Sequence, residues 1–150
     1  MTMRAALLAL GLMAAAPLAS ADLGSDEMTS RPIIAGNWVF KSFTYDACEF
    51  GGIARLTPSG EENTFTCELT ARQTCPNIEW VVRQSCVAHR TGDQLVIRSE
   101  IEEFITGPET DSYWPDNFIL KIHDGSRMTG SLVSHGSHAT EFTRQAEGIS

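Results

Sequence analysis

The sequence lacks several features that would assign it to common protein classes. Its 150 residues include 11 lysines and arginines against 19 aspartates and glutamates, a net charge of −8. Such a chain repels phosphate backbones, which excludes general nucleic-acid binding. Charged residues make up only 20% and hydrophobic residues 42% of the chain, which excludes a disordered polymer or a coiled coil. After the N-terminal segment no apolar run reaches about 20 residues, so no membrane-spanning helix is expected there.

Sequence motifs of common catalytic sites are also absent. The chain contains no G-x-S-x-G, no P-loop and no H-E-x-x-H, the motifs that position a nucleophile, a phosphate or a zinc-activated water. Glu100 and Glu102 share a strand face, but it is the outward face, which favours solvated charges over an acid/base pair. We therefore expect a non-enzymatic protein with no catalytic residue and no cofactor.

The first 21 residues are typical of an export signal. One arginine precedes an apolar stretch too short to span a membrane, and Ala19-Ser20-Ala21 fits the small-x-small cleavage rule. We expect cleavage before Asp22, a flexible polar arm over residues 22–31, and a single domain over residues 32–150. The protein is then periplasmic or secreted, with no membrane span after signal removal.

The four cysteines, Cys48, Cys67, Cys75 and Cys86, all lie in the exported part of the chain. An even number of cysteines in an oxidising compartment predicts two disulfides. The gaps of 19, 8 and 11 positions do not fit the close pairs of a zinc–cysteine site.

Hydrophobic residues in the domain recur with a period of two, which is typical of β-strands. No helix or repeat is predicted. Turn residues separate the strands, and eight short-linked strands favour an all-β, eight-stranded antiparallel up-and-down barrel, which leaves no edge strand exposed. The alternation slips at Glu102-Glu103-Phe104, which predicts a β-bulge. The predicted strands are Asn37–Tyr45, Gly51–Thr57, Asn63–Thr74, Glu79–Arg90, Gln94–Phe104, Asn117–His123, Arg127–Ser134 and Ala139–Arg144.

Facing residues indicate the length of one hairpin loop. A two-residue turn at Asp124-Gly125 would set Ile122 opposite Arg127, which mixes core with solvent. A three-residue loop that includes Ser126 sets Ile122 opposite Met128 and keeps apolar residues together, so we prefer it.

The Pro76-Asn77 turn indicates the disulfide pairing. A two-residue turn there sets Cys67 opposite Cys86, and it leaves Cys75 at the hairpin tip, at the same barrel end as Cys48. We therefore favour Cys67–Cys86 and Cys48–Cys75. Pairing in sequence order would join Cys75 to Cys86. The extended strand that ends at Cys86 spans about 23 Å, whereas the residues between Cys75 and that strand can cover only about 14 Å of this distance. This pairing therefore fails unless the strand starts late.

Gly36-Asn37-Trp38 opens the first predicted strand, and Arg144 ends the last. This pattern resembles the G-x-W signature of lipocalin-like (calycin) β-barrels, including small exported bacterial protease inhibitors in which a cysteine follows, here Cys48. The resemblance implies that Trp38 packs across the closed barrel end and that Arg144 covers it. The chain departs from lipocalins in its short loops and in lacking a second lipocalin motif and a C-terminal helix.

Three aromatic residues are predicted near the open end of the barrel. Tyr113 and Trp114 lie in the long loop Ile105–Asp116, and Trp80 lies just inside the mouth. Aromatic side chains there suit an apolar or planar ligand. In the alternative interpretation, Tyr113 and Trp114 only plug the barrel. Small inward residues argue for room inside the barrel. In the alternative interpretation, large aromatic residues fill that room. These small residues are Gly52, Ala54, Ala71, Ala88, Ser99 and Gly130.

His135 and His138 form an H-x-x-H pair on a predicted turn. With Asp111 or Glu109 they have the ligand types of a zinc site. We favour solvated turn histidines over that alternative, and so expect no metal.

These observations together favour an exported binding protein that takes a small apolar or planar ligand at the barrel mouth through Trp80, Tyr113 and Trp114. The alternatives are a protein-binding module such as a protease inhibitor, which would use the arm at residues 22–31 and the rim, and a periplasmic metal binder. The expected partner is a small molecule or an exported protein.

Overall fold

The computed structural model describes residues 31–43 and 47–146. The predicted export signal, its cleavage site and the arm through residue 30 lie outside these residues. The described part contains eight strands, and every predicted strand is present, with ends that agree with the prediction or differ from it by a few residues. The strands are β1 (Gly36–Ser42), β2 (Glu49–Pro58), β3 (Thr64–Cys75), β4 (Ile78–Thr91), β5 (Gln94–Thr106), β6 (Asn117–Ile122), β7 (Arg127–Ser134) and β8 (Gly136–Arg144).

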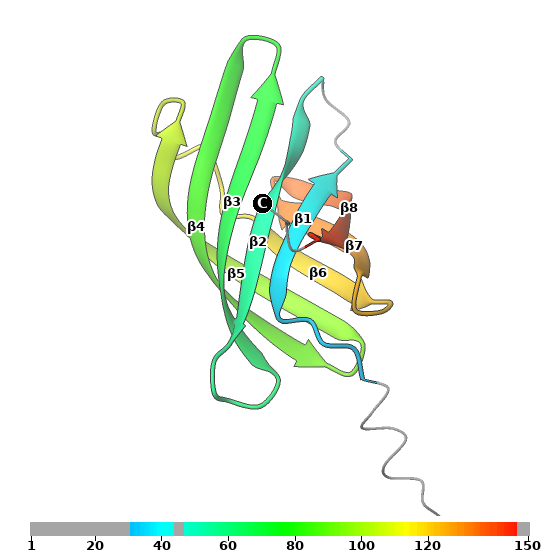
Figure 1. Cartoon of the computed structure of the whole chain (residues 1–150). Coiled ribbons are helices and arrows are strands. Elements are labelled where there is room, and N and C mark those ends of the chain that lie inside the picture. The colour runs from blue at the N-terminus through cyan, green and yellow to red at the C-terminus, as the bar shows by residue number, and fades with distance from the viewer. Residues whose placement is uncertain (1–30, 44–46, 147–150) are drawn as a thin grey trace, which may run out of the picture. The chain divides into compact units, whose positions relative to one another are not determined.

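The strands form a closed antiparallel up-and-down barrel in which each pairs with its sequence neighbour and β8 pairs with β1. Figure 1 shows this order as a continuous run of colour from cyan β1 to red β8, which lie side by side. The predicted fold class is confirmed. No helix in the described residues is long and apolar enough to cross a membrane.

The alternation of apolar and polar residues explains which faces are buried. In β3, Leu69 and Ala71 are fully buried, and in β4 so are Val82 and Ala88. Alternate residues point outward, as the exposed Ser85 and Val87 of β4 do, because successive side chains of a strand point to opposite sides. The barrel core therefore follows directly from the period of two in the sequence.

Two predicted irregularities are present in the strand pairing. Ile122 pairs with Met128, and the His123 amide donates to the Arg127 carbonyl, which confirms the three-residue loop. In the β4–β5 pair, Arg83 opposes Glu103 while Gln84 opposes Ile101. Glu102 is then the extra residue of a bulge, as the slipped alternation indicated.

Both predicted disulfides are confirmed. Cys67 opposes Cys86 in the β3–β4 ladder, and the two are bonded. Cys48 is bonded to Cys75 at the tip of the same hairpin. Two disulfides are typical of proteins that fold in an oxidising extracellular or periplasmic environment.

Trp38 and Arg144 close one end of the barrel. The Trp38 side chain is fully buried, and its Nε1 donates to the Ile34 carbonyl at 2.9 Å. The Arg144 guanidinium carbon lies 4.6 Å from the centroid of the indole, and its Nη1 donates to the Ala35 carbonyl at 2.8 Å. The contact implied by the G-x-W resemblance is therefore present.

Glycine is required at the first position of this signature. Gly36 has a φ of +124°, and a Cβ there would lie 2.5 Å from Nη1 of Arg144. A side chain would be strained in that conformation and would displace the guanidinium from the indole.

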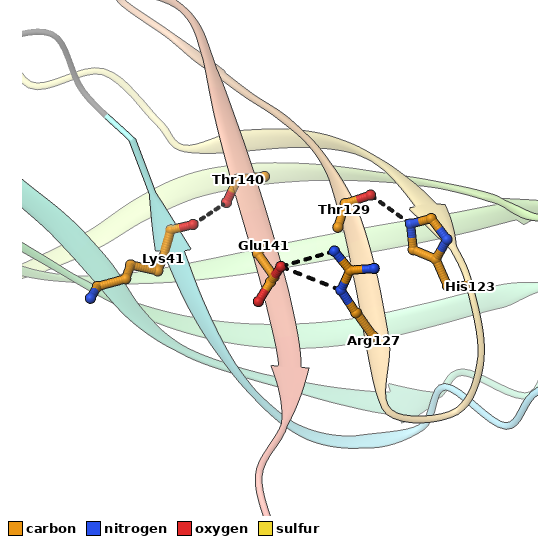
Figure 2. A network of polar contacts seen from close by, with 6 residues as sticks. All are labelled: Lys41, His123, Arg127, Thr129, Thr140 and Glu141. Carbon is orange, nitrogen blue, oxygen red and sulfur yellow. Dashed lines mark hydrogen bonds and ion pairs between the residues drawn. The ribbon is translucent and has the colours of Figure 1, made fainter.

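The outer face of β6, β7 and β8 carries polar pairs that cross neighbouring strands (Figure 2). Arg127 and Glu141 form an ion pair at 3.2 Å, with both side chains about half exposed. His123 Nε2 and Thr129 Oγ1 share a hydrogen bond of 2.6 Å. Such exposed pairs contribute little to stability because water and salt screen them.

The interior is filled by phenylalanines that pack on one another. Phe40 lies 5.3 Å from Phe118 and 5.2 Å from Phe142 between ring centroids. A Cβ at Gly52 would lie 2.6 Å from the Phe40 ring, and one at Gly130 would lie 1.9 Å from a backbone oxygen. The small inward residues therefore accommodate these rings and neighbouring strands. The expectation that they leave internal room is wrong at these two glycines.

A double-mutant cycle tests the closed end. Trp38→Ala should lower the free energy of unfolding by about 3–5 kcal/mol, the usual cost of truncating a buried tryptophan. Arg144→Ala should cost less, and its effect should shrink in the Trp38→Ala background because the cation–π partner is gone, a contact worth about 0.5–2 kcal/mol. Chemical denaturation of the oxidised protein measures both, with Trp114→Ala as a mild control. Additive losses would show that Trp38 and Arg144 are not coupled.

Candidate functional site

The opposite end of the barrel holds two adjoining cavities. The first, of about 110 Å³, is lined by aromatic residues that include Trp80, Tyr113 and Trp114. The second, of about 180 Å³, is lined by His138 and by Cys48, which forms a disulfide with Cys75. The two cavities share four lining residues, namely Gln73, Asp116, Ser134 and His135. This end of the barrel, the upper end in Figure 1, is the candidate site.

The loop over residues 107–116 is held against Trp80 at this mouth. Gly107 has a φ of +88°, and a Cβ there would lie 2.7 Å from Cδ1 of the Trp80 indole. The indole Nε1 donates to the Pro108 carbonyl at 3.1 Å. Only glycine allows this close approach, so the loop start and the Trp80 ring are positioned together.

The three predicted aromatic residues come together but occupy different environments. Tyr113 is 9% exposed, and its ring centroid lies 6.5 Å from that of Trp80 and 5.9 Å from that of Phe104. Trp114 is 53% exposed, and its ring lies 4.3 Å from the His135 ring. Tyr113 therefore plugs the barrel, while Trp80 and Trp114 present surface to the first cavity.

A buried polar cluster beneath the aromatic residues was missed by the sequence analysis. Asp116 is 2% exposed and Gln84 fully buried. The Gln84 amide donates to Asp116 Oδ2 at 2.5 Å, and its Oε1 accepts from the Asp116 backbone at 2.9 Å. The Tyr113 hydroxyl donates to the same Oδ2 at 2.9 Å. The cluster fastens the end of the loop to β4.

A signal for half of this cluster was present in the sequence. Gln84 lies midway between the inward residues Val82 and Cys86, so the period of two predicts that its side chain points into the barrel. A buried glutamine needs a polar partner. Nothing local identified Asp116 as that partner, since it lies 32 positions away in a loop.

Burial changes the protonation of this cluster. Desolvation raises the pKa of Asp116 to about 6, although the hydrogen bonds from Gln84 and Tyr113 and the nearby His135 oppose the shift. Burial, together with the adjacent Asp116 carboxylate, raises the pKa of the Tyr113 hydroxyl far above its usual range. Tyr113 therefore stays a neutral donor, and Asp116 is ionised at neutral pH.

The histidine pair does not form the zinc site considered above. His135 Nε2 shares a hydrogen bond with the Ser112 carbonyl, and His138 lines the second cavity. In the part of the chain that the structure describes, no group of three or more His, Cys, Asp or Glu side chains is placed to hold a metal ion. Asp111 and Glu109 are thus not brought together with both histidines.

A larger groove of about 440 Å³ lies on the outside of the barrel over β1 to β4. The exposed side chains of Val39 and Ile53 contribute to it. It lacks the buried, converging polar groups that fix a small ligand in place, so the mouth remains the stronger candidate.

Comparison with known proteins supports the fold. No family model matches the chain, and no curated protein matches it. Among solved structures, the chain is similar to a de novo designed, fluorescence-activating beta barrel. The TM-score is 0.54 at 14% sequence identity, and the match covers 80% of this chain and 98% of that chain. At this identity the likeness shows a shared barrel fold alone.

The raised pKa of Asp116 gives a pH-dependent stability. A carboxyl whose pKa rises from 3.8 to about 6 on folding stabilises the folded state below about pH 4, and this stabilisation is lost as the pH rises through 6. Relative to Asp116→Asn, the wild-type protein should lose about 2 kcal/mol of unfolding free energy between about pH 4 and pH 7. Urea denaturation across this range measures the difference. A constant difference would show that Asp116 titrates normally.

Proposed function

We propose that the protein is an exported, non-catalytic, lipocalin-like binding protein that holds a small planar ligand at the barrel mouth. The observation that carries this proposal is the pair of adjoining cavities at one end of a barrel whose interior is otherwise packed, the first of them walled by Trp80, Tyr113 and Trp114. Concave sites with aromatic walls and a few converging polar groups are typical of small-molecule binding.

The cavity volumes limit the size of the ligand. The two spaces are about 110 and 180 Å³, while a cavity of about 150 Å³ in a protein core holds benzene. The mouth therefore accommodates one ring, or two rings if the ligand extends across both spaces. A long lipid tail would find no room deeper in the barrel, because phenylalanines fill it.

The fold and the closed end support the lipocalin-like assignment. Trp38 is buried beneath Arg144, and Gly36 makes room for the guanidinium. The designed barrel to which this chain is similar is described as fluorescence-activating, and the likeness supports a binding role at the level of the fold.

A protein-binding role is the second candidate. It would use the arm at residues 22–31, and that arm through residue 30 lies outside the described residues. The mouth cavities favour a small-molecule partner over an exported protein, because they are too small to receive more than one side chain of a partner.

Export is supported by two independent features. Residues 1–21 have the pattern of a cleaved signal, and both cysteine pairs are oxidised. We place the protein in the periplasm or outside the cell.

The mouth can be tested with small aromatic probes. Saturation-transfer NMR with 2-phenylethanol and 2-naphthol should detect binding, and Trp114→Ala should weaken it about tenfold because a stacking surface is lost, a change of about 1.4 kcal/mol. Ile119→Ala removes a half-exposed side chain from the outer face of β6 and should leave binding unchanged. Equal losses in the two variants would argue against the mouth.

The processing site is checked by N-terminal sequencing. Protein exported from its own host should begin at Asp22, because a signal peptidase cuts after the small residues Ala19 and Ala21. Full-length protein that keeps Met1 in a reducing compartment would contradict both the export signal and its link to the disulfides.

A further inference from the structure

The Asp116 carboxylate has one oxygen bound to the protein and one that is not. Both side-chain hydrogen bonds to it, from Gln84 and Tyr113, end on Oδ2. Within residues 31–43 and 47–146, no donor contacts Oδ1. Asp116 nevertheless lines both cavities while it is only 2% exposed. Oδ1 is thus left to accept hydrogen bonds from a ligand in the site.

The charge on this carboxylate is also without a permanent partner. Neither cavity is lined by a lysine or an arginine among the described residues. The ion pairs of the described residues join exposed side chains, as in Arg83–Glu103 and Arg127–Glu141. The titratable groups that line these cavities together with this carboxylate are Tyr113, which donates to Oδ2, His135 in both cavities, and His138 in the second cavity. A buried negative charge is unfavourable unless a cation pairs with it.

The aromatic walls add a second preference for positive charge. Trp80, Tyr113 and Trp114 line the cavity that Asp116 also lines. The faces of aromatic rings attract cations, most strongly at tryptophan. The net charge of −8 also raises the local concentration of cations around the molecule. Three independent features therefore favour the same sign of charge in the ligand.

We infer that the ligand of the mouth is a small aromatic amine, whose protonated nitrogen pairs with Asp116 Oδ1 while its ring lies against Trp114 and Trp80. This inference rests on the proposed function, and it adds the chemical class of the ligand. A neutral ring leaves Oδ1 without a donor, and an anion meets the carboxylate with like charge. A metal ion lacks further ligands, since no group of three or more suitable side chains surrounds it in the described residues.

Three probes of nearly equal shape test the inference. They are 2-phenylethylamine, 2-phenylethanol and 3-phenylpropanoate, which differ mainly in charge. In calorimetric titrations of the full oxidised protein at neutral pH, the amine should bind about tenfold more tightly than the alcohol, as expected for a charge-assisted hydrogen bond to a carboxylate. The propanoate should bind more weakly than the alcohol.

Two variants assign this preference to one carboxylate. Asp116→Asn removes the charge and keeps the shape, so the amine and the alcohol should then bind equally. Glu100→Gln removes the same charge from an exposed position on β5, and it should keep the tenfold preference. Loss of the preference in both variants would mean that overall charge, and not Asp116, selects the amine, which overturns the inference.

A measurement on the wild-type protein covers the case in which Asp116→Asn does not fold. Nuclear Overhauser effects should connect the methylene group beside the amine nitrogen with the Gln84 side-chain amide, and the phenyl protons with the Trp114 indole. The reverse orientation overturns the inference.

The probes also separate this inference from the proposed function. Equal binding of the amine and the alcohol would overturn the amine class and leave a small-ligand site at the mouth. Failure of all three probes to bind would overturn both.

Discussion

The Arg144 side chain joins the segments on which barrel closure depends. It lies over the Trp38 indole, and it donates to the carbonyls of Ile33, Ala35 and Gly125. These groups belong to the start of β1, the chain before it and the turn between β6 and β7. One guanidinium therefore satisfies three backbone acceptors with charge-assisted hydrogen bonds and covers the largest buried side chain. Because Arg144 also ends β8, it helps to bring the last strand against the first.

Because Trp38 and Arg144 close one end of the barrel, the candidate site lies at the other end. Phenylalanines occupy the middle of the barrel, and glycines in neighbouring strands make room for them. The space that remains lies at the mouth, between the loop over residues 107–116 and the turn that carries His135. The Cys48–Cys75 disulfide fastens the segment before β2 to the β3–β4 hairpin there. A rigid mouth above a packed interior favours a small ligand over a long one.

In the proposed function, the buried carboxylate connects the stability of the protein with its choice of ligand. Asp116 fixes the loop through Gln84 and Tyr113, yet its own ionisation is disfavoured by burial. Keeping such a group buried costs folding free energy. Groups whose pKa is shifted in this way are common at functional sites. The same side chain that orders the mouth therefore supplies its negative charge, and a cationic occupant would relieve the cost of burying it.

The sequence by itself determined the features that depend on neighbouring residues. The period of two gave the eight strands and their inward faces, the Pro76-Asn77 turn gave the pairing of Cys67 with Cys86, and the G-x-W pattern with Arg144 indicated the closed end. Only the tertiary structure decided how full the interior is and that Asp116 meets Gln84. The reason is physical. Alternation and turn length are local properties of the chain, whereas cavity volume and the partner of a buried polar group depend on side chains that barrel closure brings together from distant strands.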